Sequence, residues 1–292
     1  MNSAFSYYPG CWLRGTGAEY GASVEGVFER AGLSLEELPG WVCCGAASGH
    51  ATAPRAAHAL CAQNLALAAA SGRPLVAPCA VCYGNLRAAQ YAAAVGDPEF
   101  PDGFTDIPDE KIAAVEVLSP LEVLSRPEIL IRLRGLCEED LSGFRAACYY
   151  GCLLTRPPEY AGGEDVDNPL SMERLLEALG AETVDWSHKT ECCGAALGAP
   201  TEEVVLDLAW RIICDAEEAG ANCIAVACPL CHWNLDVRQF EIARRRRRKV
   251  EMPVFYFSEL IAVALDLPKT ERWLKRHLTP VFPLIDGIIG FE

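Results

Sequence analysis

Ten cysteines fall into two sets of five that share one order: a single cysteine, an adjacent pair, and a pair separated by two residues. The two sets, in chain order, are Cys11, Cys43, Cys44, Cys79 and Cys82, followed by Cys152, Cys192, Cys193, Cys228 and Cys231. In each set, 35 positions separate the end of the adjacent pair from the start of the spaced pair. Thiolates ligate metals and carry out redox chemistry, so the pattern predicts two metal or redox sites.

The number of thiols in each set favours iron–sulfur ligation. Zinc takes four ligands in a closed tetrahedron, and five thiols exceed that number. A vicinal pair such as Cys43 and Cys44 cannot easily direct both sulfurs at one small ion, whereas several irons at different positions can use both. Soft thiolates suit iron–sulfur clusters. Zinc, and disulfides or free thiols, are the alternatives, because a CxxC pair alone also occurs in zinc and thioredoxin-like sites.

The cysteine sets belong to a longer internal repeat. Four blocks recur in the same order, pairing residues 8–11 with 149–152, 43–47 with 192–196, 79–86 with 228–235, and 115–119 with 254–258. A repeat of this kind indicates a duplicated structural unit. We expect two homologous domains, residues 1–140 and residues 141–292, the second of which includes a C-terminal tail.

Short apolar runs precede the cysteines and predict buried strands. The runs that end at or near a motif cysteine are 4–7, 75–77, 147–149 and 224–227. Helices are expected over residues 56–70, 85–94, 203–219 and 234–244, with Gly72 and Gly220 ending the first and third of them. Strands that alternate with helices indicate βαβ units. The expected fold class is therefore α/β, with two Rossmann-like domains and mainly parallel sheets, and ligands bind at the carboxyl ends of such strands.

Composition and charge exclude several functions. The net charge is -15 and the pI is about 4.8, which disfavours a nucleic-acid partner. No uninterrupted apolar stretch reaches the roughly 18 residues of a membrane span. The first ten residues lack a signal peptide's basic and apolar regions, so we expect a cytoplasmic protein with reduced thiols. We find neither a dinucleotide fingerprint nor a Walker motif, so flavin or nicotinamide is expected on other subunits.

The doubled five-cysteine pattern resembles the cysteine-rich CCG domain that is repeated in the B-type subunit of heterodisulfide reductase. The resemblance covers nearly the whole chain, and all ten motif cysteines are present. It implies two noncubane 4Fe–4S clusters, one on each set, which face each other at the domain interface. It further implies a disulfide oxidoreductase, in which a small-molecule disulfide is cleaved between the clusters by paired one-electron steps, or thiols are oxidised. The implied partners are a ferredoxin-like iron–sulfur subunit of the C type and, through it, a flavin subunit of the A type.

Two other functions compete with this interpretation. Similar motifs occur in electron-transfer subunits of 2-hydroxy-acid oxidases or dehydrogenases and of thiol-dependent fumarate reductases, where one half often departs from the pattern. This sequence keeps the pattern in both halves, which favours the catalytic subunit. A zinc-stabilised binding module is the third possibility.

Several residues outside the cysteine sets are candidates for supporting roles. His188 precedes Cys192 by four positions and His232 follows Cys231, so either could donate a proton to a departing thiolate; the alternative is a hydrogen bond that orders a loop. The basic run 244–249 predicts either a solvated helix face or a docking site for an acidic partner. The remaining cysteines are expected to be small core residues: Cys61, Cys137, Cys148, Cys214 and Cys223.

Overall fold

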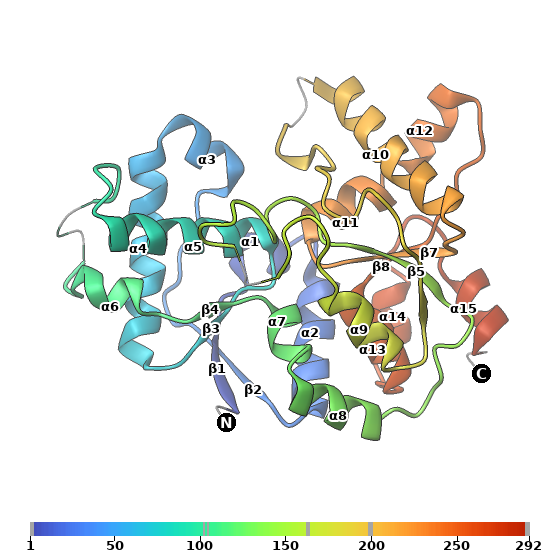
Figure 1. Ribbon diagram of the computed structural model, residues 1–292, viewed down its shortest axis with the longest axis horizontal. Helices are drawn as coiled ribbons and strands as arrows, with labels where there is room; N and C mark the ends of the chain where they lie inside the picture. Colours follow the sequence, from blue (N-terminus) through green and yellow to red (C-terminus); the bar gives the residue numbers. More distant parts are fainter. Residues whose placement is uncertain (1–2, 102, 104, 162–163, 198–200, 290–292) are drawn as a thin grey trace.

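Two four-stranded parallel sheets form the framework of the computed structural model, which describes residues 3–101, 103, 105–161, 164–197 and 201–289 (Figure 1). The first sheet has the order β2-β1-β3-β4 and contains β1 (Ala4–Tyr7), β2 (Ser34–Glu37), β3 (Leu75–Val76) and β4 (Val117–Leu118). The second has the order β6-β5-β7-β8 and contains β5 (Arg145–Tyr149), β6 (Glu182–Thr183), β7 (Cys223–Val226) and β8 (Val254–Tyr256). All strand pairs are parallel. The expected fold class, two Rossmann-like α/β units, is therefore confirmed.

Helices connect successive strands in both halves, although two helices join β1 to β2 and, within the described residues, only one joins β5 to β6. In the first half they are α1 (Gly10–Leu13), α2 (Ala18–Arg30), α3 (Ala46–Thr52), α4 (Pro54–Ser71), α5 (Ala80–Val95), α6 (Asp109–Ala113), α7 (Pro120–Leu124) and α8 (Pro127–Gly135). In the second half they are α9 (Ser171–Glu177), the 3-10 turn η1 (Ala195–Leu197), α10 (Glu202–Glu218), α11 (Pro229–Asp236), α12 (Gln239–Arg246), α13 (Phe257–Ala264), α14 (Thr270–Leu274) and α15 (Phe282–Ile288). Gly72 and Gly220 have positive φ at the ends of α4 and α10, as expected of helix-terminating glycines.

The helix predicted over residues 234–244 is wrong in one respect, because it is broken into α11 and α12. The break lies beside Asp236, whose carboxylate accepts hydrogen bonds from the backbone N–H groups of Leu278 and Thr279. The Thr279 hydroxyl also donates to the Asp236 carbonyl oxygen, at 3.0 Å. A segment 42 residues further along the chain thus caps the end of α11, which local sequence cannot reveal. The predicted C-terminal tail includes α15, and residues 290–292 lie outside the described residues.

The fourth repeat block is also corrected, by a shift of two residues. Val76 pairs with Leu118 in the first sheet, and Ala225 pairs with Phe255 in the second. Val76 and Ala225 each lie three positions before a CxxC motif, so Leu118 corresponds to Phe255. Because side chains alternate along a strand, a shift of two residues keeps the same faces and the sequence pattern alone does not distinguish the two alignments.

The corrected alignment matches Ser119 with Tyr256. Each residue caps the helix that follows the fourth strand, and each has a glutamate three positions later, Glu122 or Glu259. Both glutamate side chains accept a hydrogen bond from the backbone N–H of the capping residue, at 2.6 and 3.0 Å respectively. The shared feature of the two blocks is therefore a capping interaction.

The two halves interlock through the helices between the sheets. Helix α2 packs against α13 and α14, and α9 packs against α7, so each half contributes a helix to the other (Figure 1). The buried hydroxyls of Ser23 and Ser258 hydrogen bond across this boundary at 2.6 Å. The halves consequently share one apolar core.

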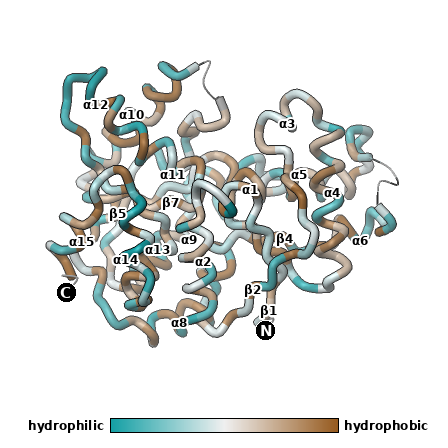
Figure 2. The backbone as a smooth tube through the Cα atoms, turned by 180° about the vertical axis from the view of Figure 1, so that it is seen from behind, coloured by the Kyte–Doolittle hydropathy of each residue, from teal (hydrophilic) through white to brown (hydrophobic). Residues whose placement is uncertain are grey.

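The end of α12 is among the most hydrophilic segments of the chain (Figure 2). Among the described residues, we find no helix with the length and apolarity needed to cross a membrane.

Candidate metal centres

Five thiols converge in the first half at the carboxyl ends of the strands. Cys79 caps the N-terminus of α5, and Cys82 lies in the first turn of that helix. The Cys44 sulfur lies 3.5 Å from the Cys82 sulfur, and the Cys43 sulfur lies 4.0 Å from that of Cys11. Cys79 in turn lies close enough to Cys82 to affect its pKa. All five predicted cysteines of this set are therefore brought together.

The second half repeats this arrangement. Cys228 caps α11 and hydrogen bonds with Cys231. The sulfur atoms of Cys193 and Cys231 are 3.5 Å apart, the same separation as in the first half. Cys152 hydrogen bonds with Cys192. All fifteen cysteines, each within the described part of the chain, are free thiols.

A glycine in each half makes room for the sulfur atoms. Gly10 and Gly151 have φ angles of +64° and +69°. A Cβ atom added to Gly10 would lie 3.0 Å from the Cys82 sulfur, and one added to Gly151 would lie 3.1 Å from the Cys231 sulfur. Each glycine thus allows the backbone to approach the thiols closely, as a bulky inorganic ligand requires.

Two further contacts hold the adjacent cysteines in position. The buried Tyr8 hydroxyl donates to the carbonyl oxygen of Val42, at 2.7 Å, and the Tyr149 hydroxyl donates to that of Glu191, at 2.6 Å. Both carbonyls belong to the residue that precedes the adjacent cysteine pair. These bonds fix the entry of each cysteine loop, which is otherwise irregular.

An asparagine three positions after each CxxC motif supports the same loop. The Asn85 amide donates to the Cys44 sulfur at 3.4 Å and to the Ala46 carbonyl oxygen at 3.2 Å. The Asn234 amide donates to the Cys193 carbonyl oxygen at 2.9 Å. The asparagines belong to the repeated block 79–86 and 228–235, but their role emerges only from the folded chain.

The local environment stabilises the thiolate form of Cys44 in the first half and of Cys192 and Cys228 in the second. Hydrogen bonding with Cys82 lowers the pKa of Cys44 to about 6, although burial acts in the opposite direction. Hydrogen bonding with Cys152 lowers the pKa of Cys192 to about 6 in the same way. The backbone N–H of Gly194 also donates to the Cys192 sulfur, at 3.3 Å. Thiolates are the form that binds metal, so the donor set fits two iron–sulfur clusters.

The two cysteine sets meet at the boundary between the halves. The Cys79 and Cys228 thiols lie close enough across this boundary to shift each other's pKa, raising that of Cys79 and lowering that of Cys228. The buried Tyr20 hydroxyl lies 3.3 Å from the Pro78 carbonyl oxygen and 3.1 Å from that of Ala227, the residues directly before these two cysteines. One side chain therefore contacts both CxxC segments.

Sequence reasoning missed Tyr20, because its hydrogen-bond partners lie 58 and 207 residues away in the chain. A lone tyrosine on an amphipathic helix gives no local signal of such a role.

A second contact between the halves lies beside the cysteines. The rings of Trp12 and Trp233 meet edge to face, with centroids 5.9 Å apart. Gly84 approaches the other half so closely that an added Cβ would lie 3.2 Å from the Leu153 carbonyl oxygen. Trp12 and Leu153 each follow the first cysteine of their set, and Gly84 and Trp233 lie at matching places after the CxxC motifs. The boundary therefore has an approximate two-fold relation.

The two predicted histidines occupy different environments. The Nδ1 atom of the partly exposed His188 lies 2.8 Å from the carboxylate of Asp215, which also accepts from the His188 backbone N–H. His188 is thus anchored to α10. His232 is buried, and its Nε2 donates to the Val254 carbonyl oxygen at 3.0 Å. Burial, followed by the neighbouring His277, lowers the pKa of His232.

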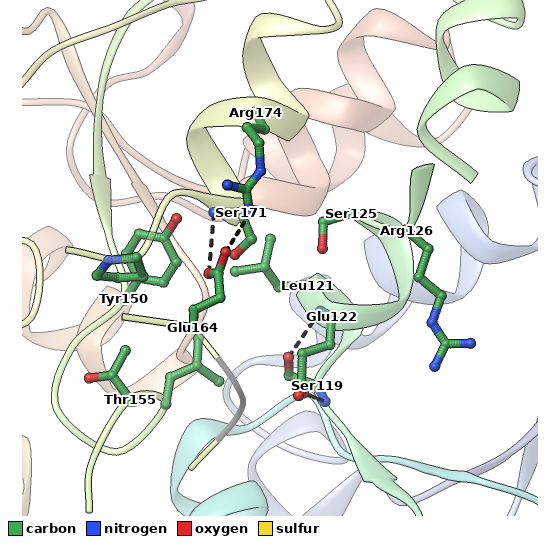
Figure 3. Close-up of a pocket in the computed structure, with 12 residues that line it drawn as sticks. Ser119, Leu121, Glu122, Ser125, Arg126, Tyr150, Thr155, Glu164, Ser171 and Arg174 are labelled. Carbon is green, nitrogen blue, oxygen red and sulfur yellow. Dashed lines mark hydrogen bonds and ion pairs between the residues drawn. The ribbon is translucent and has the colours of Figure 1, made fainter. Parts of the chain in front are cut away.

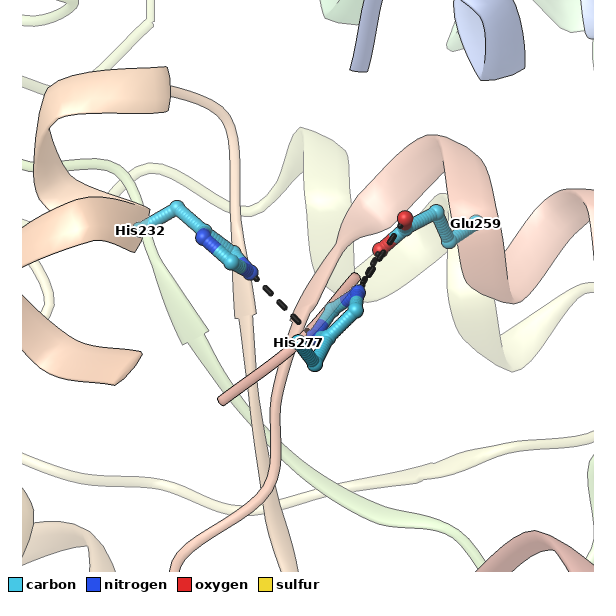
Figure 4. Close-up of side chains that lie close together, drawn as sticks. All are labelled: His232, Glu259 and His277. Atoms are coloured by element: carbon cyan, nitrogen blue, oxygen red, sulfur yellow. Dashed lines mark hydrogen bonds and ion pairs between the residues drawn. The ribbon is translucent and has the colours of Figure 1, made fainter. Parts of the chain in front are cut away.

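His232 begins a buried series of polar groups (Figure 4). Its Nε2 lies 3.4 Å from Nδ1 of His277, and Nε2 of His277 lies 3.0 Å from the Glu259 carboxylate. Because the His277 ring lies between the other two, the three groups are hydrogen bonded in series, with one nitrogen or oxygen atom of each within 4.8 Å of the others. The arrangement fits a hydrogen-bonded relay better than a metal site. Sequence reasoning identified His232 but neither of its partners.

The residues outside the two cysteine sets lie where packing and ion pairing explain them. Cys61, Cys148 and Cys223 are buried, whereas Cys137 and Cys214 are partly exposed. Three arginines of the basic run pair with carboxylates of α10: Arg245 with Glu202 and Glu203, Arg246 with Asp207, and Arg248 with Glu217. The basic run therefore has partners within the chain.

Comparison with known proteins supports this description of the chain. A family model described as a cysteine-rich domain, CCG, matches residues 5–87 and 146–236. The chain is 31% identical over 279 residues to the 8-methylmenaquinol:fumarate reductase membrane anchor subunit of Wolinella succinogenes, covering 95% of this chain and 98% of that protein. It is 29% identical over 257 residues to the B-type subunit of the ferredoxin:CoB-CoM heterodisulfide reductase of Methanosarcina mazei, covering 85% of each.

A solved structure shares the fold. The crystal structure of a hypothetical protein from Helicobacter pylori matches 96% of this chain with a TM-score of 0.73 and 13% sequence identity. The chain spans about half of that protein, 53% of its length. Together with the doubled thiol sets, the comparisons show that the chain belongs to the cysteine-rich CCG family that includes the B-type subunit of heterodisulfide reductase, and that it is a redox iron–sulfur subunit.

Proposed function

We propose that this chain is the catalytic subunit of a heterodisulfide-reductase-like complex, and that it reduces a small-molecule disulfide or oxidises thiols. Each five-cysteine set would hold one noncubane 4Fe–4S cluster. The observation that carries the proposal is the meeting of the two sets at the contact between Cys79 and Cys228. When bound, the clusters supply single electrons and iron sites that accept sulfur ligands. Two adjacent sites suit a disulfide, because its reduction takes two electrons.

The residues of this chain would position and enclose that chemistry. Gly10 and Gly151 let the backbone approach the sulfurs, and Tyr20 holds the two CxxC segments at one separation. Such fixed geometry is what preorganisation requires. His188 remains our candidate proton donor in the second half, with Asp215 orienting its ring. His232 is the other candidate, and its proton would come through His277.

We further propose that electrons arrive from a ferredoxin-like iron–sulfur subunit, and through it from a flavin subunit. The similarity to the B-type subunit of a ferredoxin-dependent heterodisulfide reductase supports this arrangement. We also propose that the chain consists of two domains that meet near residue 140. The link between α8 and β5, residues 136–144, would then join two cluster-binding domains of common origin.

A second function has its own support. The chain is 31% identical over 95% of its length to a subunit of an 8-methylmenaquinol:fumarate reductase. In that case the two clusters would relay electrons between a quinol and a partner, without a disulfide substrate. That relative is named a membrane anchor subunit, whereas the described helices of this chain are too short or too polar to span a membrane.

Spectroscopy with candidate substrates distinguishes these two functions. The chain, purified anaerobically, should contain about eight irons and a matching amount of sulfide if both sets are loaded. Zinc in stoichiometric amounts without sulfide would exclude iron–sulfur binding. Adding a thiol or a disulfide should change the electron paramagnetic resonance signals of both clusters in the catalytic subunit. If a range of thiols and disulfides changes neither signal while electrons still pass through the complex, the chain is a relay.

A further inference from the structure

A cavity of about 290 Å³ lies between the two halves, at the meeting of α7 and α9 (Figure 3). The first half contributes Leu121 and Glu122 to its wall, and the second half contributes Tyr150, Leu154 and Ser171. Its volume is close to the lower end of the range for small-molecule sites. A ligand of one or two rings would fill it.

The matching place on the other side of the molecule is filled by aromatic rings. There α2 meets α13, just as α9 meets α7 at the cavity. The Tyr256 ring stacks on Tyr20 with centroids 4.3 Å apart and on His232 with centroids 4.1 Å apart. The two stacks have interplanar angles of 10° and 15°, so the three rings are nearly parallel.

One contribution to the difference is a pair of matched residues. Ser119 takes the place of Tyr256 at the cap of α7, so the first half lacks the ring that fills this place in the second half. The residue that matches His232 after the CxxC motif is Tyr83, whose hydroxyl lies 3.3 Å from the Glu122 carboxylate. The cavity thus occupies the position of a missing planar side chain.

The walls suit a ring that carries an oxygen atom. Leu121, Leu154 and Pro169 provide apolar surface, and hydroxyl groups of Ser125 and Thr155 also line the cavity. Three charged side chains complete the wall: Arg126, and Glu164 and Arg174, which form an ion pair with each other. Figure 3 shows Glu122 and Ser119 hydrogen bonded to each other at one end. Burial raises the pKa of Glu122. A phenolic hydroxyl could donate to this carboxylate, and a keto oxygen could accept from a serine hydroxyl.

We propose that this cavity binds a small ligand built on a planar ring with a hydroxyl or keto oxygen, the chemistry of a phenol or a quinol head group. The ring would take the place that Tyr256 fills in the other half, and its oxygen would reach the end marked by Ser119 and Glu122. A phenol in this cavity would be independent of the reaction that the clusters carry out, whereas a quinol head group would rest on the second function proposed above.

Isothermal titration of the full, cluster-loaded chain tests the proposal with p-cresol, which is the side chain of tyrosine. Its saturated analogue 4-methylcyclohexanol has nearly the same size and the same hydroxyl but is not planar. We expect p-cresol to bind at least about tenfold more tightly, which corresponds to about 1.4 kcal/mol. Ser119→Tyr restores the residue of the second half and should weaken p-cresol binding at least about tenfold. Ser171→Phe fills the cavity from the opposite wall and should do the same.

Each outcome decides the proposal. Equal affinity for the two probes, no detectable p-cresol binding at millimolar concentration, or unchanged binding in a folded filled variant would overturn it. Iron content and the unfolding midpoint establish that each variant is folded, and Ser171→Phe serves alone if Ser119→Tyr fails that check. A soluble 1,4-naphthoquinol distinguishes the two kinds of ligand. Tighter binding than p-cresol indicates a quinol head group, and weaker binding indicates a single-ring phenol.

Discussion

The two halves hold their thiols alike but surround them differently. The Cys44–Cys82 and Cys193–Cys231 sulfur pairs have the same 3.5 Å separation. The glycine beside each sulfur pair, the tyrosine that ties each cysteine loop and the asparagine after each CxxC motif also recur. One cysteine set is nevertheless more open, because Cys11 is exposed whereas its counterpart Cys152 is only partly so.

The surroundings differ in the groups one layer beyond the sulfurs. In the first half Tyr83 contacts Glu122 directly, whereas in the second half His277 lies between His232 and Glu259. The positions that touch sulfur are thus repeated, and the positions that set polarity and access are not. Such groups tune the potential of a cluster, so two similar ligand sets can hold clusters with unequal properties.

Removing one thiol from either half should have the largest effect. Cys44→Ala and Cys193→Ala should each lose about half of the iron, since each removes a ligand from one set only. Each should also lose most disulfide reduction, and the double variant should be little worse, because residues that act as a unit give non-additive losses. Iron and sulfide assays and steady-state kinetics measure both effects. Additive losses would mean that the halves act independently.

The glycines beside the sulfurs should give the next largest effect. Gly10→Ala and Gly151→Ala each place a Cβ about 3 Å from a cysteine sulfur and impose a positive φ that costs about 1–2 kcal/mol. We expect a lower free energy of unfolding, measured with urea, together with loss of iron from the altered half alone.

Gly96→Ala is the matched control for these two variants. Gly96 has a φ of +66°, and an added Cβ would meet nothing within 4 Å. Gly96→Ala should therefore lower the free energy of unfolding, because alanine is unfavourable at a positive φ, but it should lose no iron. If all three variants keep their iron, crowding of the sulfurs is unimportant.

The parts of the molecule that local sequence specifies were predictable. Short apolar runs and glycine stops located strands β1, β3, β5 and β7 and helices α4 and α10, because burial and helix termination act over a few residues. The ten thiols were recognisable because their order recurs and because 35 positions separate the adjacent pair from the CxxC motif in both sets. The register of the fourth block was not, since alternation along a strand looks the same after a shift of two residues.

The features that could not be predicted from the sequence depend on contacts between segments that are distant in the chain. Tyr20 bonds to carbonyls 58 and 207 positions away, and α11 ends where Thr279 caps it. His277 reaches Glu259 only after α14 has turned the chain back. The Tyr20 contacts lie at the boundary between the halves, and the Thr279 and His277 contacts lie within the second half. In each case tertiary packing decides the role of the residue.

Tyr8 and Tyr149, which hydrogen bond to the two cysteine loops, test whether the loops are supported equally in the two halves. Tyr8→Phe and Tyr149→Phe each remove one buried hydrogen bond to the carbonyl before the cysteine pair. Each should lower the free energy of unfolding by about 1–3 kcal/mol, because a buried carbonyl loses its partner. Urea titration should give similar losses for the two variants. A loss in only one half would show that the loops are supported differently.

The polar series around His277 gives the smallest effect, a change in how stability depends on pH. Burial alone would lower the pKa of His277, but the nearby carboxylates of Glu259, Asp236 and Glu19 outweigh burial and raise it. A raised pKa in the folded state means that the folded protein binds this proton more tightly than the unfolded chain. The stabilisation is therefore complete below the ordinary histidine pKa of about 6.5 and is lost as the pH rises through the folded value.

Replacing His277 by glutamine should remove this pH dependence and leave the first half unaffected. The measurement is the unfolding midpoint of both proteins between about pH 5.5 and pH 8.5, where other groups titrate equally in the two and cancel in the difference. We expect the wild type to lose its advantage over His277→Gln as the pH rises. Tyr83→Phe is the control, because Tyr83 occupies the matching position in the first half and phenols ordinarily titrate near pH 10. The difference in unfolding midpoint between wild type and Tyr83→Phe should therefore not change with pH in this range. A constant difference between wild type and His277→Gln would mean that His277 acts in the relay without changing its charge, and the two halves would then differ in shape alone.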